Sequence, residues 1–280
     1  RVEASFFREP PRAVAQFPKR DDYRIIDIAH WMKESDIART YQRSSDDVYW
    51  LARNSLSPMI PAAYGLRTVL EIDFDLTALL PTEDFTRSMW EVSEKRQDWL
   101  AVAGSMSNAW YFGMYRHPGA ALYDANGVMR DVQPVRYLAG EQHPRYYFAS
   151  QLVPIRSREE FVQRLATGRY AKRVAFVNGP AFAPAQGIVR SVRESANRAR
   201  IEVEAASQAF LVMSVTPHKY WRVTIDGTEV PAIVTNIGYQ GVVVPGGKHL
   251  VEMRYRNPVI IAGAALSLAA LLLALWSLKR

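Results

Sequence analysis

An uncharged, apolar run at the C-terminal end constrains the fold of this 280-residue chain more than any other feature. No charged residue occurs between Arg256 and Lys279, where the sequence reads NPVIIAGAALSLAALLLALWSL. A helix that begins at Pro258 would span about 32 Å within this run, close to the hydrocarbon thickness of a bilayer. Proline suits a first helical turn, and Trp276 suits the membrane interface at the far end. We therefore predict a transmembrane helix at residues 257–278, with the lipid bilayer as a partner.

A buried helix of a soluble protein is the alternative interpretation of this run, but core helices are rarely this long and this free of polar residues. Gly263 and Ser267 form a small-residue pair that could seat a neighbouring helix, although such pairs arise easily in an Ala-rich segment. Basic residues flank both ends, so charge alone does not fix the orientation. The N-terminal sequence RVEASFFREPPRAVAQ lacks the apolar stretch of a signal peptide and an initiator Met. We therefore expect the chain to be a fragment of a longer protein.

Apolar and polar residues alternate with a period close to two over much of residues 187–256, which indicates β-strands. The alternating segment WRVTI at 221–225 is followed at once by Asp226-Gly227, a strong hairpin signal because both turn positions need positive φ. Pro231 marks an edge or a bulge in the returning segment. About six or seven short strands of this kind predict an antiparallel β-sandwich that leads directly into the membrane helix.

Residues 1–186 mix helical and strand signals, which predicts an α+β domain. A capping box at residues 157–160 (SREE) opens a helix, and Gly168 is placed to end it. A second helix is predicted at residues 83–101, with Thr82 as its cap. Apolar runs on either side of the capping-box helix predict strands.

The charge distribution and the cysteine content exclude several classes of function. The chain has 35 Lys and Arg against 28 Asp and Glu, a net charge of +7, but the excess is spread thinly along the sequence. A nucleic-acid-binding protein would concentrate that charge on one face or in one run, so we expect no nucleic-acid partner. Cysteine is absent, which excludes disulfides, Cys-ligated zinc, iron–sulfur clusters and a thiol nucleophile.

A row of acidic residues is the first candidate for chemistry. Glu71, Asp73 and Asp75 alternate with apolar residues, so their carboxylates share one face of a predicted strand. Such a row could bind a cation or supply a general base, or it could be the solvent-facing side of a half-buried strand. Trp110 and Tyr146 belong to aromatic clusters whose rings could contact a glycan or pack in the core.

No motif in the chain identifies a catalytic residue. The sequence lacks a nucleophile elbow, a phosphate-binding loop and a dinucleotide fingerprint. Its five histidines do not have the spacing of metal ligands on a helix. We therefore predict no catalytic residue, no cofactor-binding residue and no metal ligand in this chain.

The order of motifs in the C-terminal part resembles the C-terminal end of the YfhO family of bacterial membrane proteins. Within residues 210–255, an aromatic–Trp pair precedes the hairpin VTIDGTEV, and VPGGKHLVEMRY leads to the membrane helix. Upstream, HPRYYF at 143–148 is similar to the family's PRAYF-type strand, and YGLRTV at 64–69 is similar to its G-I-R-S segment. The resemblance covers most of the chain and is most specific in the C-terminal hairpin.

This resemblance implies a parent protein like the GT-C glycosyltransferases, with many membrane helices in the bacterial inner membrane and a polyprenyl-phosphate-linked sugar as donor. The catalytic acid of such enzymes lies in an early extracytoplasmic loop, upstream of this chain, so no catalytic role is carried over. We expect this chain to be the extracytoplasmic C-terminal portion. It would cover the membrane active site, contact the upstream membrane helices and help to bind an acceptor glycan or a lipid-linked sugar.

Two other hypotheses come from different classes of protein. The chain could be a single-span, membrane-anchored carbohydrate-binding or assembly module without catalytic activity, which predicts a signal peptide just upstream of Arg1. It could also be a self-contained hydrolase that uses the acidic row. Substitution of Asp73 or Asp75 by Asn would then abolish an activity.

Overall fold

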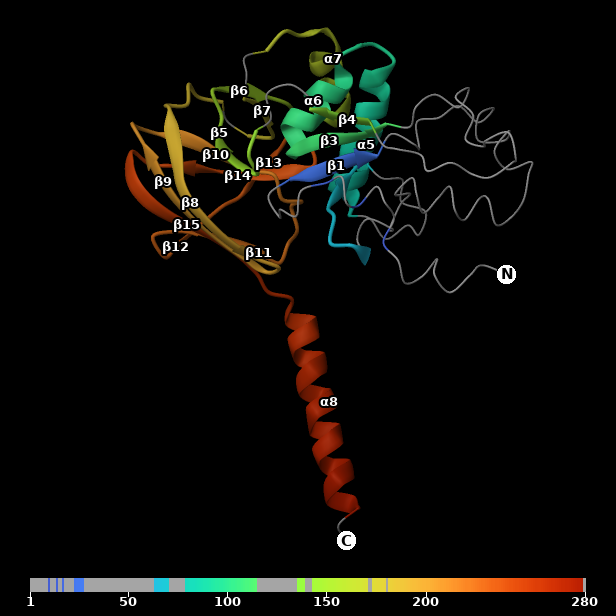
Figure 1. Ribbon diagram of the computed structural model, residues 1–280. Helices are drawn as coiled ribbons and strands as arrows, with labels where there is room; N and C mark the ends of the chain where they lie inside the picture. The colour runs from blue at the N-terminus through green and yellow to red at the C-terminus, as the bar shows by residue number, and fades with distance from the viewer. Residues whose placement is uncertain are drawn as a thin grey trace, which may run out of the picture.

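The structure is a computed structural model that describes residues 10, 14, 17, 23–27, 63–70, 79–114, 135–138, 143–170, 173–179 and 181–278. Within these residues, three β-sheets are accompanied by helices, and one apolar helix extends from the folded body at the C-terminal end (Figure 1). In outline, this confirms the predicted class of mixed helices and sheets with a sandwich-like pair of sheets.

Two of the sheets form the sandwich. The six-stranded sheet has the order β5-β10-β14-β13-β7-β6. Its strands are β5 (Tyr146–Phe148), β6 (Gln151–Pro154), β7 (Val174–Val177), β10 (Ala209–Met213), β13 (Ile233–Thr235) and β14 (Tyr239–Val244). The five-stranded sheet has the order β12-β11-β15-β9-β8. Its strands are β8 (Gly187–Ser195), β9 (Arg198–Ala205), β11 (Trp221–Ile225), β12 (Thr228–Val230) and β15 (Gly247–Tyr255).

One apolar core joins the two sheets, as expected for a sandwich. The six-stranded sheet contributes Tyr146, Phe148, Leu211, Met213, Val242 and Val244, and the five-stranded sheet contributes Ala199, Ile201, Val203, Val223, Ile225, Val251 and Met253. These positions recur at every second residue of their strands, because successive side chains of a strand point to opposite faces. The alternation of apolar and polar residues that predicts strands in residues 187–256 therefore matches the alternation of buried and outward-facing side chains in the sandwich.

The sandwich reaches further back in the chain than the sequence predicts. Strands β5, β6 and β7 precede residue 186, yet they belong to the same sheet as β10, β13 and β14. The division between residues 1–186 and 187–256 therefore passes through a hydrogen-bonded sheet. The sheet is also mixed rather than purely antiparallel, because β6 and β7 pair in parallel. Their connection is a helix, α7 (Arg158–Thr167), as parallel pairing requires.

Helix α7 has the cap that its sequence predicts. The Ser157 hydroxyl accepts a hydrogen bond from the Glu160 amide at 3.2 Å, and Gly168 is the C-cap residue. The backbone of Gly168 is not left-handed; a side chain there would instead collide with the ring of Tyr170. Glycine at this position is therefore explained by the close approach of Tyr170.

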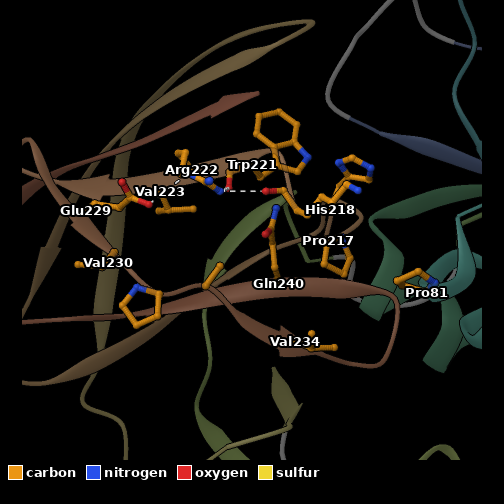
Figure 2. Close-up of a pocket in the computed structure, with 13 residues that line it drawn as sticks. Pro81, Pro217, His218, Trp221, Arg222, Val223, Glu229, Val230, Val234 and Gln240 are labelled. Carbon is orange, nitrogen blue, oxygen red and sulfur yellow. Dashed lines mark hydrogen bonds and ion pairs between the residues drawn. The ribbon is translucent and has the colours of Figure 1, made fainter. Parts of the chain in front are cut away.

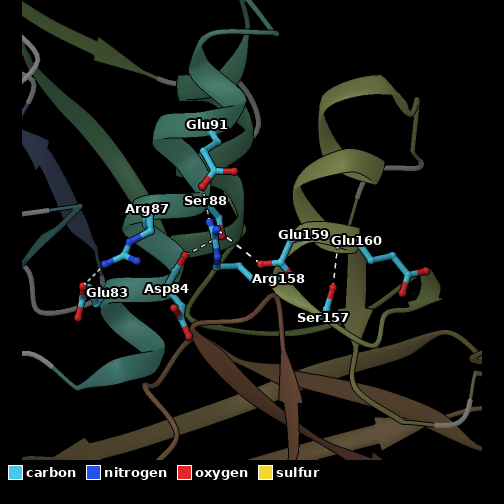
Figure 3. A network of polar contacts seen from close by, with 9 residues as sticks. All are labelled: Glu83, Asp84, Arg87, Ser88, Glu91, Ser157, Arg158, Glu159 and Glu160. Atoms are coloured by element: carbon cyan, nitrogen blue, oxygen red, sulfur yellow. Dashed lines mark hydrogen bonds and ion pairs between the residues drawn. The ribbon is translucent and has the colours of Figure 1, made fainter.

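Helix α5 (Leu80–Ser93) packs beside α7. Arg158 Nη1 on α7 lies 2.6 Å from Glu91 Oε1 on α5, an ion pair that Figure 3 shows between the two helices. Beneath them lies a second core, which contains Phe85, Met89, Val92, Phe161, Val162, Leu165, Val153 and Phe176. The helices therefore cover the part of the six-stranded sheet formed by β6 and β7.

The single helix predicted at residues 83–101 is wrong in its extent. Helix α5 ends at Ser93, and a separate helix, α6, runs over Trp99–Ser107. Arg96 lies in the break, where its guanidinium donates to the carbonyls of Leu165 and Gly168 at 2.8 and 3.1 Å. In this break, Arg96 supplies donors to the open C-terminal end of α7, whose last carbonyls need them.

The predicted Thr82 cap is also wrong. The N-cap of α5 is Leu79, and Pro81 occupies the first helical turn, where its missing N–H costs nothing. The Thr82 hydroxyl instead lies 3.3 Å from the Thr216 hydroxyl, in the segment that follows β10. Thr82 therefore joins α5 to the sandwich.

A third sheet of four strands has the order β2-β1-β3-β4. Its strands are β1 (Arg24–Asp27), β2 (Thr68–Val69), β3 (Ala109–Met114) and β4 (Val135–Leu138). Strand β1 is parallel to both β2 and β3, while β3 and β4 are antiparallel. Ile26 and Val69 of this sheet are buried in the same core as α5 and α7, which ties the N-terminal part to the helices.

The Asp226-Gly227 hairpin turn is confirmed. Asp226 has φ of 52° and Gly227 has φ of 83°, and strands β11 and β12 pair on either side. Pro231 follows β12, the edge strand of the five-stranded sheet, and the chain then enters β13 of the other sheet. Proline fits here because a residue at a sheet edge does not need a backbone N–H to pair with another strand.

The C-terminal helix, α8, runs over Pro258–Ser277 and is long and apolar enough to cross a membrane. The Asn257 side chain caps it by accepting a hydrogen bond from the Val259 amide at 3.0 Å. No residue of α8 is buried against the described part of the chain. A fully exposed apolar helix suits a lipid environment, so α8 suggests a membrane anchor.

Candidate functional site

The sequence-predicted site residues do not form one site in the described structure. Glu71, Asp73 and Asp75 lie outside the described residues. Trp110 belongs to strand β3, but its side chain is also outside the description. Tyr146 of β5 is 3% exposed and packs in the sandwich core, and burial raises the pKa of its hydroxyl to about 12. The Tyr146 ring therefore has no open face for a sugar in this conformation.

The candidate site is instead a pocket between the five-stranded sheet and the start of α5, with a volume of about 420 Å³. Its floor is formed by β13 and β14 of the six-stranded sheet, and its wall is the β11–β12 hairpin (Figure 2). The described residues that line it are Pro81, Pro217, His218, Lys219, Trp221, Arg222, Val223, Glu229, Val230, Pro231, Ala232, Val234 and Gln240. The pocket thus combines apolar surface with several hydrogen-bonding side chains.

Gln240 supplies an unused donor in the pocket floor. It belongs to β14 and is only 2% exposed, and its Nε2 has no hydrogen-bond partner among the described residues. In Figure 2, Gln240 projects from β14 toward the side on which Trp221 and Arg222 lie. A buried amide without a partner is costly, so an acceptor oxygen of a ligand would be favoured there.

Arg222 and Glu229 form an ion pair across the β11–β12 hairpin. The Nε atom of Arg222 lies 3.3 Å from Glu229 Oε1, and its Nη1 donates to the Lys219 carbonyl at 2.9 Å. Both side chains are largely exposed, so the pair contributes little to stability and stays accessible. Their free oxygen and nitrogen atoms can bind the hydroxyl groups of a ligand.

Aromatic rings connect the pocket to the start of α8. Trp221 pairs with Tyr255 across strands β11 and β15, with ring centroids 5.3 Å apart. His218 lies 5.4 Å from the same Tyr255 ring, and the Arg256 amide donates to the Tyr220 carbonyl. Because α8 begins at Pro258, the pocket lies at the end of the sandwich from which α8 leaves (Figure 1).

The other end of β11 carries a structural pair of residues. His249 Nδ1 lies 2.7 Å from Asp226 Oδ2, and the Leu250 amide donates to Asp226 Oδ1 at 2.8 Å. The hydrogen bond between the two side chains raises the pKa of His249 and lowers the pKa of Asp226. These two residues of the hairpin motif therefore hold the β11–β12 turn against the start of β15.

The pocket was not predicted from the sequence. The one available signal was Gln240, a polar residue within the otherwise apolar strand YQGVVV. The other lining residues come from α5, β11, β12, β13 and their connections, so no local motif contains them. Within the described ranges, no group of three or more His, Asp and Glu side chains is arranged to hold a metal ion.

Comparisons with known proteins find no relatives for this chain. No protein-family model matches it, and the searches of the curated proteins and of the solved structures give no match.

Proposed function

We propose that this chain is the extracytoplasmic C-terminal portion of a multispanning, GT-C-like membrane glycosyltransferase of the bacterial inner membrane. In this role it covers the membrane active site and binds an acceptor glycan or a lipid-linked sugar at the bilayer surface. The donor in the parent protein would be a polyprenyl-phosphate-linked sugar. The motivation is the resemblance of residues 210–255 to the YfhO family, together with the apolar helix that follows.

The observation that carries the binding proposal is the pocket beside the start of α8. A sugar has apolar C–H faces and many hydroxyl groups, so it needs an aromatic surface and fixed hydrogen-bonding groups together. Trp221 offers the aromatic surface, and Gln240, Arg222 and Glu229 offer donors and acceptors. A ligand held at this end of the sandwich would lie close to the membrane, where a lipid-linked sugar is presented.

The pocket favours binding rather than hydrolysis of a glycan. Glycoside hydrolysis generally needs two carboxyl groups on opposite sides of the bond that breaks. Glu229 is the only carboxylate among the described lining residues, and Arg222 neutralises it at 3.3 Å. We therefore assign no catalytic residue to the pocket and leave the transfer reaction to the rest of the parent protein.

Binding can be tested with the full chain in detergent micelles. The probes are a polyprenyl-phosphate-linked hexose in mixed micelles and a panel of soluble oligosaccharides, with affinity measured by calorimetry. We expect Trp221→Ala to weaken binding by about tenfold or more, because an aromatic contact of this kind contributes on the order of 1–2 kcal/mol. Trp90→Ala, at an exposed tryptophan of α5 that does not line the pocket, is the control and should bind normally.

Equal weakening by both substitutions, or no binding of any probe, would overturn the assignment of the pocket. The multispanning parent is tested separately by the coding sequence upstream of Arg1. Many hydrophobic spans with an acidic residue in the first extracytoplasmic loop would support the transferase. A lone signal peptide would instead favour a single-span carbohydrate-binding or assembly module, with the same pocket as its binding site.

A further inference from the structure

Two segments far apart in the sequence bring their arginines to one glutamate. Arg67 lies just before β2, Arg145 lies just before β5, and Glu194 lies near the end of β8. The Nε atom of Arg145 is 3.1 Å from Glu194 Oε1, and Arg67 Nη1 is 3.9 Å from the same oxygen. One carboxylate oxygen therefore faces two guanidinium groups.

Arg24, the first residue of β1, adds a third guanidinium to this cluster. Its two terminal nitrogens donate to the carbonyls of Ser107 and Ser214, both at 2.6 Å, and its guanidinium lies over the Tyr239 ring. Burial lowers the pKa of Arg24 to about 10, and the positive charges of Arg145 and Arg67 act in the same direction. Arg24 is therefore fixed in place and charged at neutral pH, next to two like charges.

The positive charge of the cluster exceeds what its described neighbours balance. Arg67 and Arg145 share the Glu194 carboxylate and Arg24 is held by carbonyls, so three guanidinium charges accompany one negative charge among these described residues. Arg67 Nη1 and Arg145 Nε are buried, and both face Glu194 Oε1, but neither makes a well-directed hydrogen bond within the described part of the chain. Poorly directed hydrogen bonds of buried donors and unbalanced buried charge are both unfavourable. Among the described residues, the cluster therefore has more positive charge and more donors than the Glu194 carboxylate alone can match.

We propose that Arg67 and Arg145, with Arg24 behind them, form a binding site for a phosphate group. A phosphate monoester carries close to two negative charges at neutral pH and offers three acceptor oxygens, which matches the excess of charge and of donors. A carboxylate would balance only one charge. Guanidinium groups bind phosphate through paired hydrogen bonds, and the Arg67 side chain is 39% exposed, so the cluster can be approached from the Arg67 side.

The position of the cluster allows two sources of phosphate. Glu194 lies in the same cross-strand row as Ala199 and Met253, and Met253 is five residues before Pro258. The turn between β8 and β9 also lies at this end, because the Tyr255 amide donates to the Asn197 carbonyl. The site therefore lies toward the end of the sandwich from which α8 leaves, where either a soluble phosphate compound or a lipid headgroup could supply the group.

The test measures phosphate binding by the full chain in non-ionic detergent. Thermal unfolding is followed by intrinsic fluorescence as inorganic phosphate is added, with chloride at matched ionic strength as the reference. We expect phosphate, and not chloride, to raise the unfolding temperature in a saturable way. Arg67→Gln should weaken this binding by about tenfold or more, since it removes a charge-assisted contact.

Arg190→Gln is the matched control, because Arg190 also lies on the sandwich and pairs with a single glutamate, Glu204, at 2.9 Å. It should leave phosphate binding unchanged. Glu194→Gln separates binding from a purely structural role. It removes the negative charge inside the cluster, so the variant should be less stable without phosphate and should bind phosphate more tightly than the unmodified chain.

A second arm replaces free phosphate with mixed micelles that contain phosphatidic acid, compared with phosphatidylcholine. Stabilisation only by phosphatidic acid, lost in Arg67→Gln, would support a lipid headgroup as the source. Stabilisation by free phosphate would support a soluble source. The proposal fails if neither probe stabilises the chain, if Arg67→Gln binds as well as Arg190→Gln, or if phosphate does not restore stability to Glu194→Gln.

Discussion

Replacing Phe161 by Ala tests the second core, which joins α7 to the six-stranded sheet. Phe161 is fully buried, and its ring meets Phe176 of β7 edge-on with centroids 5.1 Å apart. A Phe→Ala change in a core costs about 3–5 kcal/mol, because the lost burial is joined by the cavity that remains. The aromatic pair with Phe176 places this site toward the upper part of that range. We expect a loss of about 4–5 kcal/mol.

The assay is guanidinium chloride unfolding of the full chain in a non-ionic detergent, followed by fluorescence and far-UV circular dichroism. A loss of this size is a large part of the roughly 5–15 kcal/mol that stabilises a typical domain. It should also lower the thermal midpoint by about 10 °C. Gln163→Ala, on the exposed face of the same helix, should change stability by no more than about 0.5 kcal/mol. A loss below about 1 kcal/mol in Phe161→Ala would refute the packing of α7 on β7.

Two further predictions concern the hairpin and the C-terminal helix. Because the pKa of His249 is raised and that of Asp226 is lowered, their pair stabilises the fold between those two pKa values. This stability is lost as pH rises through the raised pKa of His249, above 6.5. Between about pH 5 and about pH 9, the thermal unfolding temperature should therefore decline, and Asp226→Asn should remove this decline. An unchanged decline in the Asp226→Asn variant would contradict the prediction. Leu268→Arg, near the middle of α8, should cost about 3 kcal/mol of membrane insertion and release the chain from vesicles in flotation assays, whereas Leu268→Ile should stay bound. Equal flotation of both variants would show that α8 does not span the bilayer.

Local features of the fold were predictable because they depend on residues that are neighbours in the sequence. The Ser157 cap of α7 and the positive φ values at Asp226-Gly227 follow from the chemistry of a few adjacent residues. The alternation in β9 and β15 reports burial on one face, so the strands were recognisable before their partners were known.

Features that depend on distant contacts were predicted less well. Nothing within residues 83–101 indicates that Arg96 caps α7, since its acceptors, the carbonyls of Leu165 and Gly168, lie about seventy residues further along the chain. The boundary at residue 186 was misplaced for a similar reason. Sheet pairing satisfies backbone groups of whichever strands lie side by side, and β5, β6 and β7 carry no local sign of their partners.

The periodic and local parts of this protein can be derived from its amino-acid sequence: the apolar C-terminal helix, the alternating strands, the hairpin turn and the cap of α7. These follow from side-chain burial and backbone geometry within a few residues. Only the tertiary structure decided which strands share a sheet, where the pocket beside Trp221 and Gln240 forms, and which arginines meet at Glu194. Those sites are assembled from segments far apart in the chain, and no local rule relates their residues until the fold brings them together.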